Sequence, residues 1–206
     1  MATNNIVNAA TTGIQSRTST GVWNGRTLTG TSNQISVANG TGASANPTFS
    51  LPAFVVNNLK PCFVSYLSGN LTDVTGDGTQ YNIVFDSTLV NQNSNFSTVT
   101  GKFNPPVTGK YCFISTITLS GALVGNTAAF PRHVDETGVI YRGMTINPFV
   151  ASIGGVMTIT HSAVVALTAG TLMRSQLIVS NGTKVIDILA GTSSAPLTTF
   201  SGFLIC

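Results

Sequence analysis

The sequence predicts an all-β fold, a sandwich or barrel of short strands, and three observations carry this prediction. Thr, Val, Ile and Phe are frequent, whereas the helix formers Glu, Lys and Gln are scarce. Glycine recurs about every ten residues, 21 times in 206, which favours short strands separated by turns. Only 7% of residues are charged but 42% are hydrophobic, and this balance indicates a folded chain rather than a disordered one.

The main domain is predicted to run from residue 61 to residue 206. Strand signals recur there at even spacing, separated by turn residues such as Gly76-Asp77-Gly78 and Asn181-Gly182. Many short strands with regular turns are typical of sandwiches and barrels, and we expect almost no helix. The predicted strands cover residues 62–68, 79–86, 96–100, 110–120, 138–146, 155–167, 172–180, 184–190 and 198–206.

Residues 1–60 form a separate, short β-rich arm. Ile35 and Val37 alternate with polar residues, as do Phe49 and Leu51, and the turn signal Asn39-Gly40 lies between them, so we expect a hairpin. A hairpin this short buries little by itself, which favours a role in attachment or between subunits. Residues 1–26 are rich in Asn, Thr, Ala and Gly, and either an attachment arm or a disordered tail fits them.

A more specific pattern lies within the main domain. Phe85 is followed at fixed intervals by aromatic, Asn and Gly positions, and the stretch Phe103-Asn-Pro-Pro-Val-Thr-Gly-Lys-Tyr-Cys-Phe113 completes it. The pattern resembles the signature of the globular head of complement component q, shared with the tumour necrosis factor superfamily. Ser115 departs from it, because the family prefers Phe or Tyr there. The signature positions are Phe85, Asn91, Phe96, Phe103, Gly109, Tyr111 and Phe113.

Two further segments support the resemblance, which covers residues 61–206. Leu167-Thr-Ala-Gly-Thr-Leu172 is similar to a turn of the family, with Thr171 in place of Asp, and the ending Phe200-Ser-Gly-Phe203-Leu-Ile is similar to its last central strand. The resemblance implies a jelly-roll β-sandwich of about ten strands that forms a homotrimer and binds ligands through loops or grooves between subunits. It also makes the signature positions and Phe203 core residues. Strand alternation independently places Tyr111 and Phe113 on one buried face.

Charge and hydropathy restrict the partners and the location. The nine basic residues are scattered singly, so nucleic acid is not an expected partner. No run of about 18 apolar residues occurs, and we expect no membrane insertion. No secretion signal is visible at Met1-Ala-Thr-Asn-Asn-Ile-Val, which favours a virion component released with its particle, although an extracellular or cell-surface location stays open.

Little catalytic chemistry is available, and we predict that the chain is not an enzyme and holds no cofactor. His133 and Asp135 are two residues apart and lack a nucleophile elbow. The segment with Arg132, His133, Asp135 and Glu136 concentrates charge, and it is predicted to be either an exposed contact loop or a solvated connection. Asp73 and Asp77 are weak metal candidates, but a turn is the preferred interpretation because a full calcium ladder is missing.

Three cysteines are too few for a disulfide framework or a zinc site. The preferred interpretation makes Cys62, Cys112 and Cys206 buried small hydrophobic residues. A Cys62–Cys206 disulfide is the alternative, since the jelly roll would place its first and last strands side by side.

Three functions are compatible with these observations. The leading hypothesis is a trimeric structural and receptor-binding module of a virus or phage particle, such as a fibre, spike or decoration protein, because the arm resembles segments of phage fibre-like proteins. The second is a bacterial surface or filament subunit that polymerises through its N-terminal arm. The third is a soluble carbohydrate-binding lectin. The expected partners are further copies of the chain, a surface glycan or protein receptor, and other particle or filament subunits.

Overall fold

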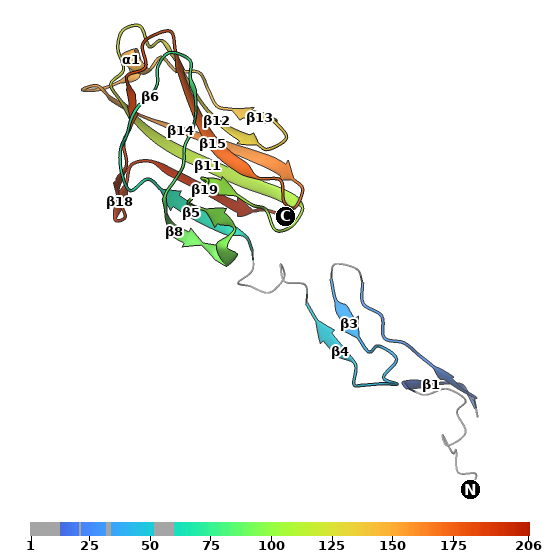
Figure 1. Ribbon diagram of the computed structural model, residues 1–206. Helices are drawn as coiled ribbons and strands as arrows, with labels where there is room; N and C mark the ends of the chain where they lie inside the picture. The colour runs from blue at the N-terminus through green and yellow to red at the C-terminus, as the bar shows by residue number, and fades with distance from the viewer. Residues whose placement is uncertain (1–12, 21, 32–33, 52–59) are drawn as a thin grey trace. The chain divides into compact units, whose positions relative to one another are not determined.

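The computed structural model describes residues 13–20, 22–31, 34–51 and 60–206 (Figure 1). The chain divides into two compact units, Met1–Leu59 and Lys60–Cys206, which we call the arm and the head.

The arm holds two small antiparallel strand pairs. Strand β1 (Gln15–Ser19) pairs with β2 (Val22–Gly25), and β3 (Ser36–Ala38) pairs with β4 (Thr48–Ser50). Val37 stands opposite Phe49, so the two segments expected to form a hairpin are paired, and Asn39 begins their connection with a φ of 53°. Phe49 stays 64% exposed, which agrees with the small burial expected of strands this short.

The head contains a six-stranded and a seven-stranded antiparallel sheet. In the six-stranded sheet the order is β13-β12-β15-β10-β9, and β7 also pairs with β15. Its strands are β7 (Gln80–Asn82), β9 (Phe96–Ser97), β10 (Lys102–Phe103), β12 (Ala128–Asp135), β13 (Ile140–Arg142) and β15 (Met173–Ser180).

The seven-stranded sheet has the order β6-β16-β11-β19-β5-β8, and β14 also pairs with β11. Figure 1 shows the long strand β11 beside β19, with which it pairs. The strands of the seven-stranded sheet are β5 (Cys62–Tyr66), β6 (Leu71–Thr75), β8 (Ser87–Asn91), β11 (Gly109–Ser120), β14 (Val156–Leu167), β16 (Ile186–Ile188) and β19 (Thr199–Leu204). A further short pair joins β17 (Gly191–Thr192) and β18 (Ala195–Pro196).

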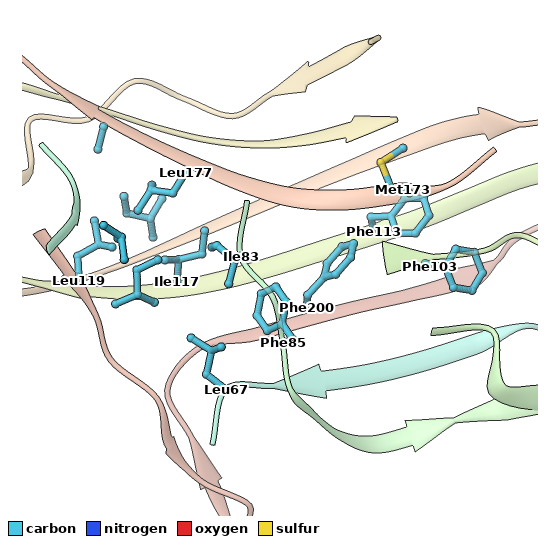
Figure 2. Packing of buried hydrophobic residues seen from close by; sticks show 14 of the residues in the cluster. Leu67, Ile83, Phe85, Phe103, Phe113, Ile117, Leu119, Met173, Leu177 and Phe200 are labelled. Atoms are coloured by element: carbon cyan, nitrogen blue, oxygen red, sulfur yellow. The ribbon is translucent and has the colours of Figure 1, made fainter. Parts of the chain in front are cut away.

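The two sheets share one hydrophobic core, and the fold is the predicted all-β jelly roll. Figure 2 shows Met173 of one sheet beside Phe113 of the other, and Leu177 on the side of Ile117 and Leu119. Aromatic rings dominate one end, where Phe63 lies 4.7 Å from Phe96 between ring centroids. Such contacts add to the free energy gained from burying apolar area. The buried aromatic residues are Phe63, Phe85, Phe96, Phe103, Tyr111, Phe113 and Phe200.

Helical structure in the described residues is confined to two short segments. These are the 3-10 turn Gln92–Ser94 and the helix α1 (Pro148–Ala151), where the Asn147 side chain accepts a hydrogen bond from the Val150 amide and Pro148 begins the helix. Strands β6, β8, β10 and β12 were not predicted, and the predicted strand 79–86 is limited to Gln80–Asn82. No helix in the described part of the chain has the length and hydrophobicity that crossing a membrane requires.

Candidate interaction face and buried histidine pair

The outer surface of β5, β8, β11, β14 and β19 in the seven-stranded sheet is broad and almost free of charge, and we call it the open face. Alternate residues of its long strands point away from the core because their neighbours, such as Phe113 and Phe200, point into it. The antiparallel register aligns the outward residues in rows across the strands. One row is Val164, Cys112, Phe203 and Cys62, and the next is Ser162, Ile114, Ser201, Val64 and Val90.

Large apolar side chains on the open face reach solvent. Val164 is 62% exposed, Phe203 46% and Val90 44%. Lys110 is the single charged residue in β5, β8, β11, β14 and β19 together. A contiguous surface of this kind is rare on a monomer and is typical of an interface between proteins.

Strand β14 forms an edge beside the open face. Among the described residues it pairs only with β11, along all twelve of its residues. Edge strands are usually protected by charged residues, proline or bulges, and β14 contains no Asp, Glu, Lys, Arg or Pro. This edge and the open face therefore form one continuous surface suited to another protein chain.

The predicted contact loop is wrong for three of its four residues. Arg132, His133 and Asp135 belong to strand β12 and are at most 5% exposed, and only Glu136 lies beyond it, partly exposed. The density of charge suggested a solvated loop, but Arg132 and Asp135 have hydrogen-bond partners within the fold. The side chains of His133 and Asp135 are therefore not available as exposed contacts.

The charged groups of this segment connect neighbouring strands. Arg132 donates from Nε to Gln176 Oε1 at 2.8 Å and from Nη2 to Gln80 Oε1 at 2.7 Å. Asp135 Oδ1 accepts hydrogen bonds from the amides of residues 137 and 139, which closes the turn before β13. Glu136 accepts from Lys102 at 2.5 Å and from Arg174 at 3.2 Å, and the Lys102 hydrogen bond holds the pKa of Glu136 below its usual value.

The rings of His133 and His161 lie against one another between the two sheets, tilted by 30°. Their ring centroids are 4.5 Å apart, and the residues are 0% and 7% exposed. Ser115 Oγ lies 2.9 Å from His133 Nε2 and donates to Ser175 Oγ at 2.9 Å, while His161 Nε2 lies 2.9 Å from the Tyr141 carbonyl. Burial lowers the pKa of His133 to about 3, helped by repulsion from His161, and burial also lowers the pKa of His161. The expectation that His133 lies in an exposed or solvated loop is wrong.

Of the aspartates considered for metal binding, Asp77 serves a turn, whereas Asp73 lies within strand β6 and not in the turn that was expected. Asp77 Oδ1 accepts from the Thr79 amide at 3.0 Å, and hydrogen bonds from Thr79 lower the pKa of Asp77. Asp73 adopts a φ of 52°, and its amide donates to Asp187 Oδ1. Among the residues that the structure describes, no three His, Cys, Asp or Glu side chains are grouped as metal ligands.

The cysteines are thiols, and the Cys62–Cys206 disulfide is absent. The expected adjacency of first and last strands holds, because β5 pairs with β19. Cys62, however, stands opposite Phe203, and Cys206 lies beyond that position with its carbonyl accepting from the Lys110 amide. Cys62 and Cys112 are half-buried and Cys206 is exposed, so the buried interpretation is wrong for Cys206.

A cavity of about 360 Å³ lies where β11 begins and β14 ends. Its lining contains no Asp, Glu or His side chain. The lining residues are Thr108, Gly109, Lys110, Ala166, Leu167, Thr168 and Cys206.

Comparison with known families identifies the head. Residues 67–205 match the family described as the C1q domain. The chain belongs to the C1q domain family. No curated protein matches it.

Solved structures similar to this C1q domain protein include three from animals. The globular domain of zebrafish complement 1qA is 18% identical, with 71% of this chain and 98% of that chain covered and a TM-score of 0.47. Murine APRIL is 9% identical, with 71% and 99% covered and a TM-score of 0.45. Eiger TNF from S. frugiperda is 11% identical, with 71% and 93% covered and a TM-score of 0.49.

Most signature positions of the C1q domain are buried in the hydrophobic core of the head. The five aromatic residues from Phe85 to Phe113 in the signature are at most 3% exposed. Asn91 orders the loop after β8, because its amide side chain exchanges two hydrogen bonds with the Phe96 backbone. Gly109 approaches Cys206 so closely that a Cβ there would lie 2.7 Å from the Cys206 carbonyl oxygen.

Phe203 is not a core residue of this C1q domain chain, and that prediction is wrong. Phe200 occupies the core, and strand alternation turns Gly202 inward and Phe203 outward onto the open face. The open face was missed because its apolar residues, such as Phe203 and Val164, read as core residues in the sequence, while the others are ordinary polar and small strand residues. Its signal in the sequence is the absence of charge between Lys110 and Arg132 and between Arg142 and Arg174.

Proposed function

We propose that the chain is a structural and receptor-binding protein whose C1q domain assembles as a homotrimer through the open face and the β14 edge. One observation carries this proposal: a partly apolar surface whose single charged strand residue is Lys110 extends over five adjacent strands. Burying it against a second copy removes apolar area from water, and Lys110 is the one strand charge that the interface has to accommodate. Within this assembly, receptors contact loops or grooves between subunits.

The arm supports attachment to a larger structure. Phe49, Leu51 and Ile35 are 64%, 54% and 44% exposed, so the β3–β4 hairpin carries apolar side chains that it cannot bury by itself. We propose that these side chains pack against other copies or against a particle. A fibre, spike or decoration protein of a virus or phage combines such an arm with a receptor-binding head, and it acts on the particle surface or outside a cell.

The mass in solution tests the assembly. Light scattering of the full chain should give three times the chain mass of 21.3 kDa. Phe203→Asp places a carboxylate in the centre of the open face and should yield monomers. Val99→Asp is the matched control, because Val99 is 85% exposed in the turn after β9 and lies outside the open face. A monomeric wild-type protein would refute the homotrimer.

A filament subunit is the second candidate, favoured by the uncharged β14 edge. An extended arm could add as a strand to the edge of a neighbouring head, which is a known mode of polymerisation. Full-length protein would then form concentration-dependent polymers, and removal of residues 1–50 would abolish them. Soluble trimers of both forms would exclude this function.

A receptor screen separates binding to glycans from binding to proteins. A glycan array with the full-length trimer tests the lectin alternative directly. Array signals at background together with saturable binding to intact cells would assign the receptor to protein, whereas a specific glycan signal would support a lectin.

A further inference from the structure

The histidine pair joins the two sheets beside the proposed assembly surface. His133 comes from β12 of the six-stranded sheet and His161 from β14 of the seven-stranded sheet. The ring of His133 also lies 5.4 Å from Phe200 and 5.9 Å from Phe113 between centroids. While His161 points inward, its neighbours Thr160 and Ser162 are exposed. A change at the pair therefore acts on the strand that forms the edge.

The hydrogen bonds fix which ring nitrogen carries the proton. The Tyr141 carbonyl can only accept, so His161 donates from Nε2. Ser115 uses its hydroxyl proton toward Ser175, so its oxygen accepts from His133 Nε2. Both Nδ1 atoms then carry lone pairs, and His133 Nδ1 is buried without a partner among the described residues. A proton added there meets no acceptor.

The space around His161 is equally restrictive. A Cβ on Gly143 would lie 3.0 Å from His161 Nδ1 and 3.0 Å from the Pro131 carbonyl oxygen. The backbone at Gly143, directly after β13, therefore lies close to the imidazole of His161. A charged imidazole could reach water only if β13 and the segment after it moved away from β14.

The groups packed against the pair supply no compensating negative charge. Those facing it are Ser115 and Phe113 of β11, Ser175 of β15, Phe200 of β19 and the Tyr141 carbonyl of β13. Burial raises the pKa of the Tyr141 hydroxyl, which is neutral below pH 10. On β12, Asp135 Oδ1 accepts from residues 137 and 139, and Glu136 binds Lys102 and Arg174.

We propose that the histidine pair is an acid-sensitive latch that holds β12 and β13 against β14, and that protonation opens this seam and dissociates the assembly. The proposal rests on the proposed trimer for its effect on assembly. The native state excludes the proton and the unfolded or opened chain accepts it. Stability is thus complete above the ordinary histidine pKa near 6.5 and decreases as the pH falls below it.

The size of the effect follows from proton linkage. One histidine that titrates only in the open state weakens closure up to about tenfold per pH unit below 6.5, hence about 30-fold between pH 7.5 and 5. These are the only two histidines among the 206 residues, and the acidic side chains ordinarily titrate below pH 5. A transition between pH 7 and 5 therefore reports on the pair.

The experiment compares full-length wild type with the double variant His133→Gln/His161→Gln at pH 7.5, 6.0 and 5.0. The glutamine amide nitrogen can replace each donating Nε2 but does not titrate. Light scattering gives the mass, and urea unfolding gives the midpoint. We expect the mass and the urea midpoint of the wild type to decrease as the pH falls to 5. Both quantities should stay constant for the double variant. If the double variant does not fold, His161→Gln alone should reduce the pH dependence.

The outcomes separate the latch from the proposed function. Equal pH profiles of wild type and variant would refute the latch even if both are trimers. A wild-type monomer at pH 7.5 would refute the trimer, while the urea midpoints would still decide whether the pair controls closure. A falling wild-type midpoint with unchanged mass would refute the dissociation step.

Discussion

Ser115 Oγ lies 2.9 Å from His133 Nε2, and this contact accounts for the departure of Ser115 from the family pattern. The resemblance expects Phe or Tyr at position 115, on an inward-facing site of β11 that is 1% exposed here. The imidazole of His133 extends from β12 into the same part of the core and lies next to the rings of Phe113 and Phe200. The small side chain of Ser115 on β11 thus leaves room for the larger polar ring of His133 on β12.

Restoring the family residue at position 115 should destabilise the protein. Ser115→Phe adds a ring where His133 already packs, and overpacking typically costs about 1–3 kcal/mol. Ser115→Ala removes the hydrogen-bond partner of the buried Nε2–H, which costs about 1–3 kcal/mol as well. Urea unfolding at pH 7.5 measures both. The double change Ser115→Phe/His133→Ala should recover part of the loss, and additive losses would show that the two positions do not share space.

Stability should decline in mild acid. The unfolded chain binds a proton at His133 near pH 6.5, whereas the native pKa is about 3, so the free energy of unfolding falls as the pH decreases between these values. The slope from this group is at most about 1.4 kcal/mol per pH unit. Urea unfolding at intervals from pH 7.5 to 4.5 measures it. A flat profile above pH 5.5 would contradict the burial of neutral imidazoles.

The fold could be predicted because its signals are local. Aromatic residues at strand period and turns built on Asn and Gly survive in any sequence that must bury one face of each strand. The turn after β14 illustrates this, since Gly170 takes a φ of 85° as a turn glycine should. Asn39-Gly40 likewise separated two segments that do pair.

The interaction face and the histidine pair could not be predicted because they depend on partners distant in sequence. Arg132 is buried because it donates hydrogen bonds to Gln80 and Gln176. No local sequence pattern indicates that these two amides lie next to it. His133 and His161 meet only when two different sheets pack. Phe203 was misplaced because Gly202 takes the inward position beside Phe113.

Gly202 should not tolerate a side chain. A Cβ at this position would lie 2.6 Å from Phe113 Cδ1 and 2.7 Å from Phe63 Cε1, both inside the packed core. Gly202→Ala should therefore lower stability by about 1–3 kcal/mol through overpacking. Gly69→Ala is the control, because a Cβ there meets nothing within 4 Å. Equal thermal midpoints for the two variants would argue against close packing of β19 on β11.

The head should fold and assemble without the arm. Every residue of the hydrophobic core cluster lies at or after Phe63, and the arm and head are separate compact units. A chain of residues 60–206 should keep the thermal midpoint and the trimeric mass of the full chain, since the open face lies wholly in the head. Calorimetry and light scattering measure these quantities. Loss of the trimer on truncation would transfer the assembly function to the arm.

Asn126 should be essential because its amide joins three loops. Its Nδ2 donates to the Gly76 carbonyl at 3.0 Å and the Thr183 carbonyl at 3.4 Å, its Oδ1 accepts from the Leu123 amide, and the residue is 0% exposed. Asn126→Asp would direct a carboxylate at two carbonyl oxygens, and leaving buried groups unpaired costs about 1–3 kcal/mol or more for a charge.

The same substitution has a distinctive pH dependence. Burial against carbonyl groups should raise the pKa of the new carboxyl, so the variant should regain stability relative to wild type as the pH falls and the carboxyl becomes a donor. Asn181→Asp is the matched control, because Asn181 bonds the Thr127 hydroxyl, which can donate to a carboxylate instead. Urea midpoints from pH 7.5 to 4.5, compared with wild type at each pH, measure the effect. A loss as small at position 126 as at position 181 would mean that the three loops do not depend on this amide.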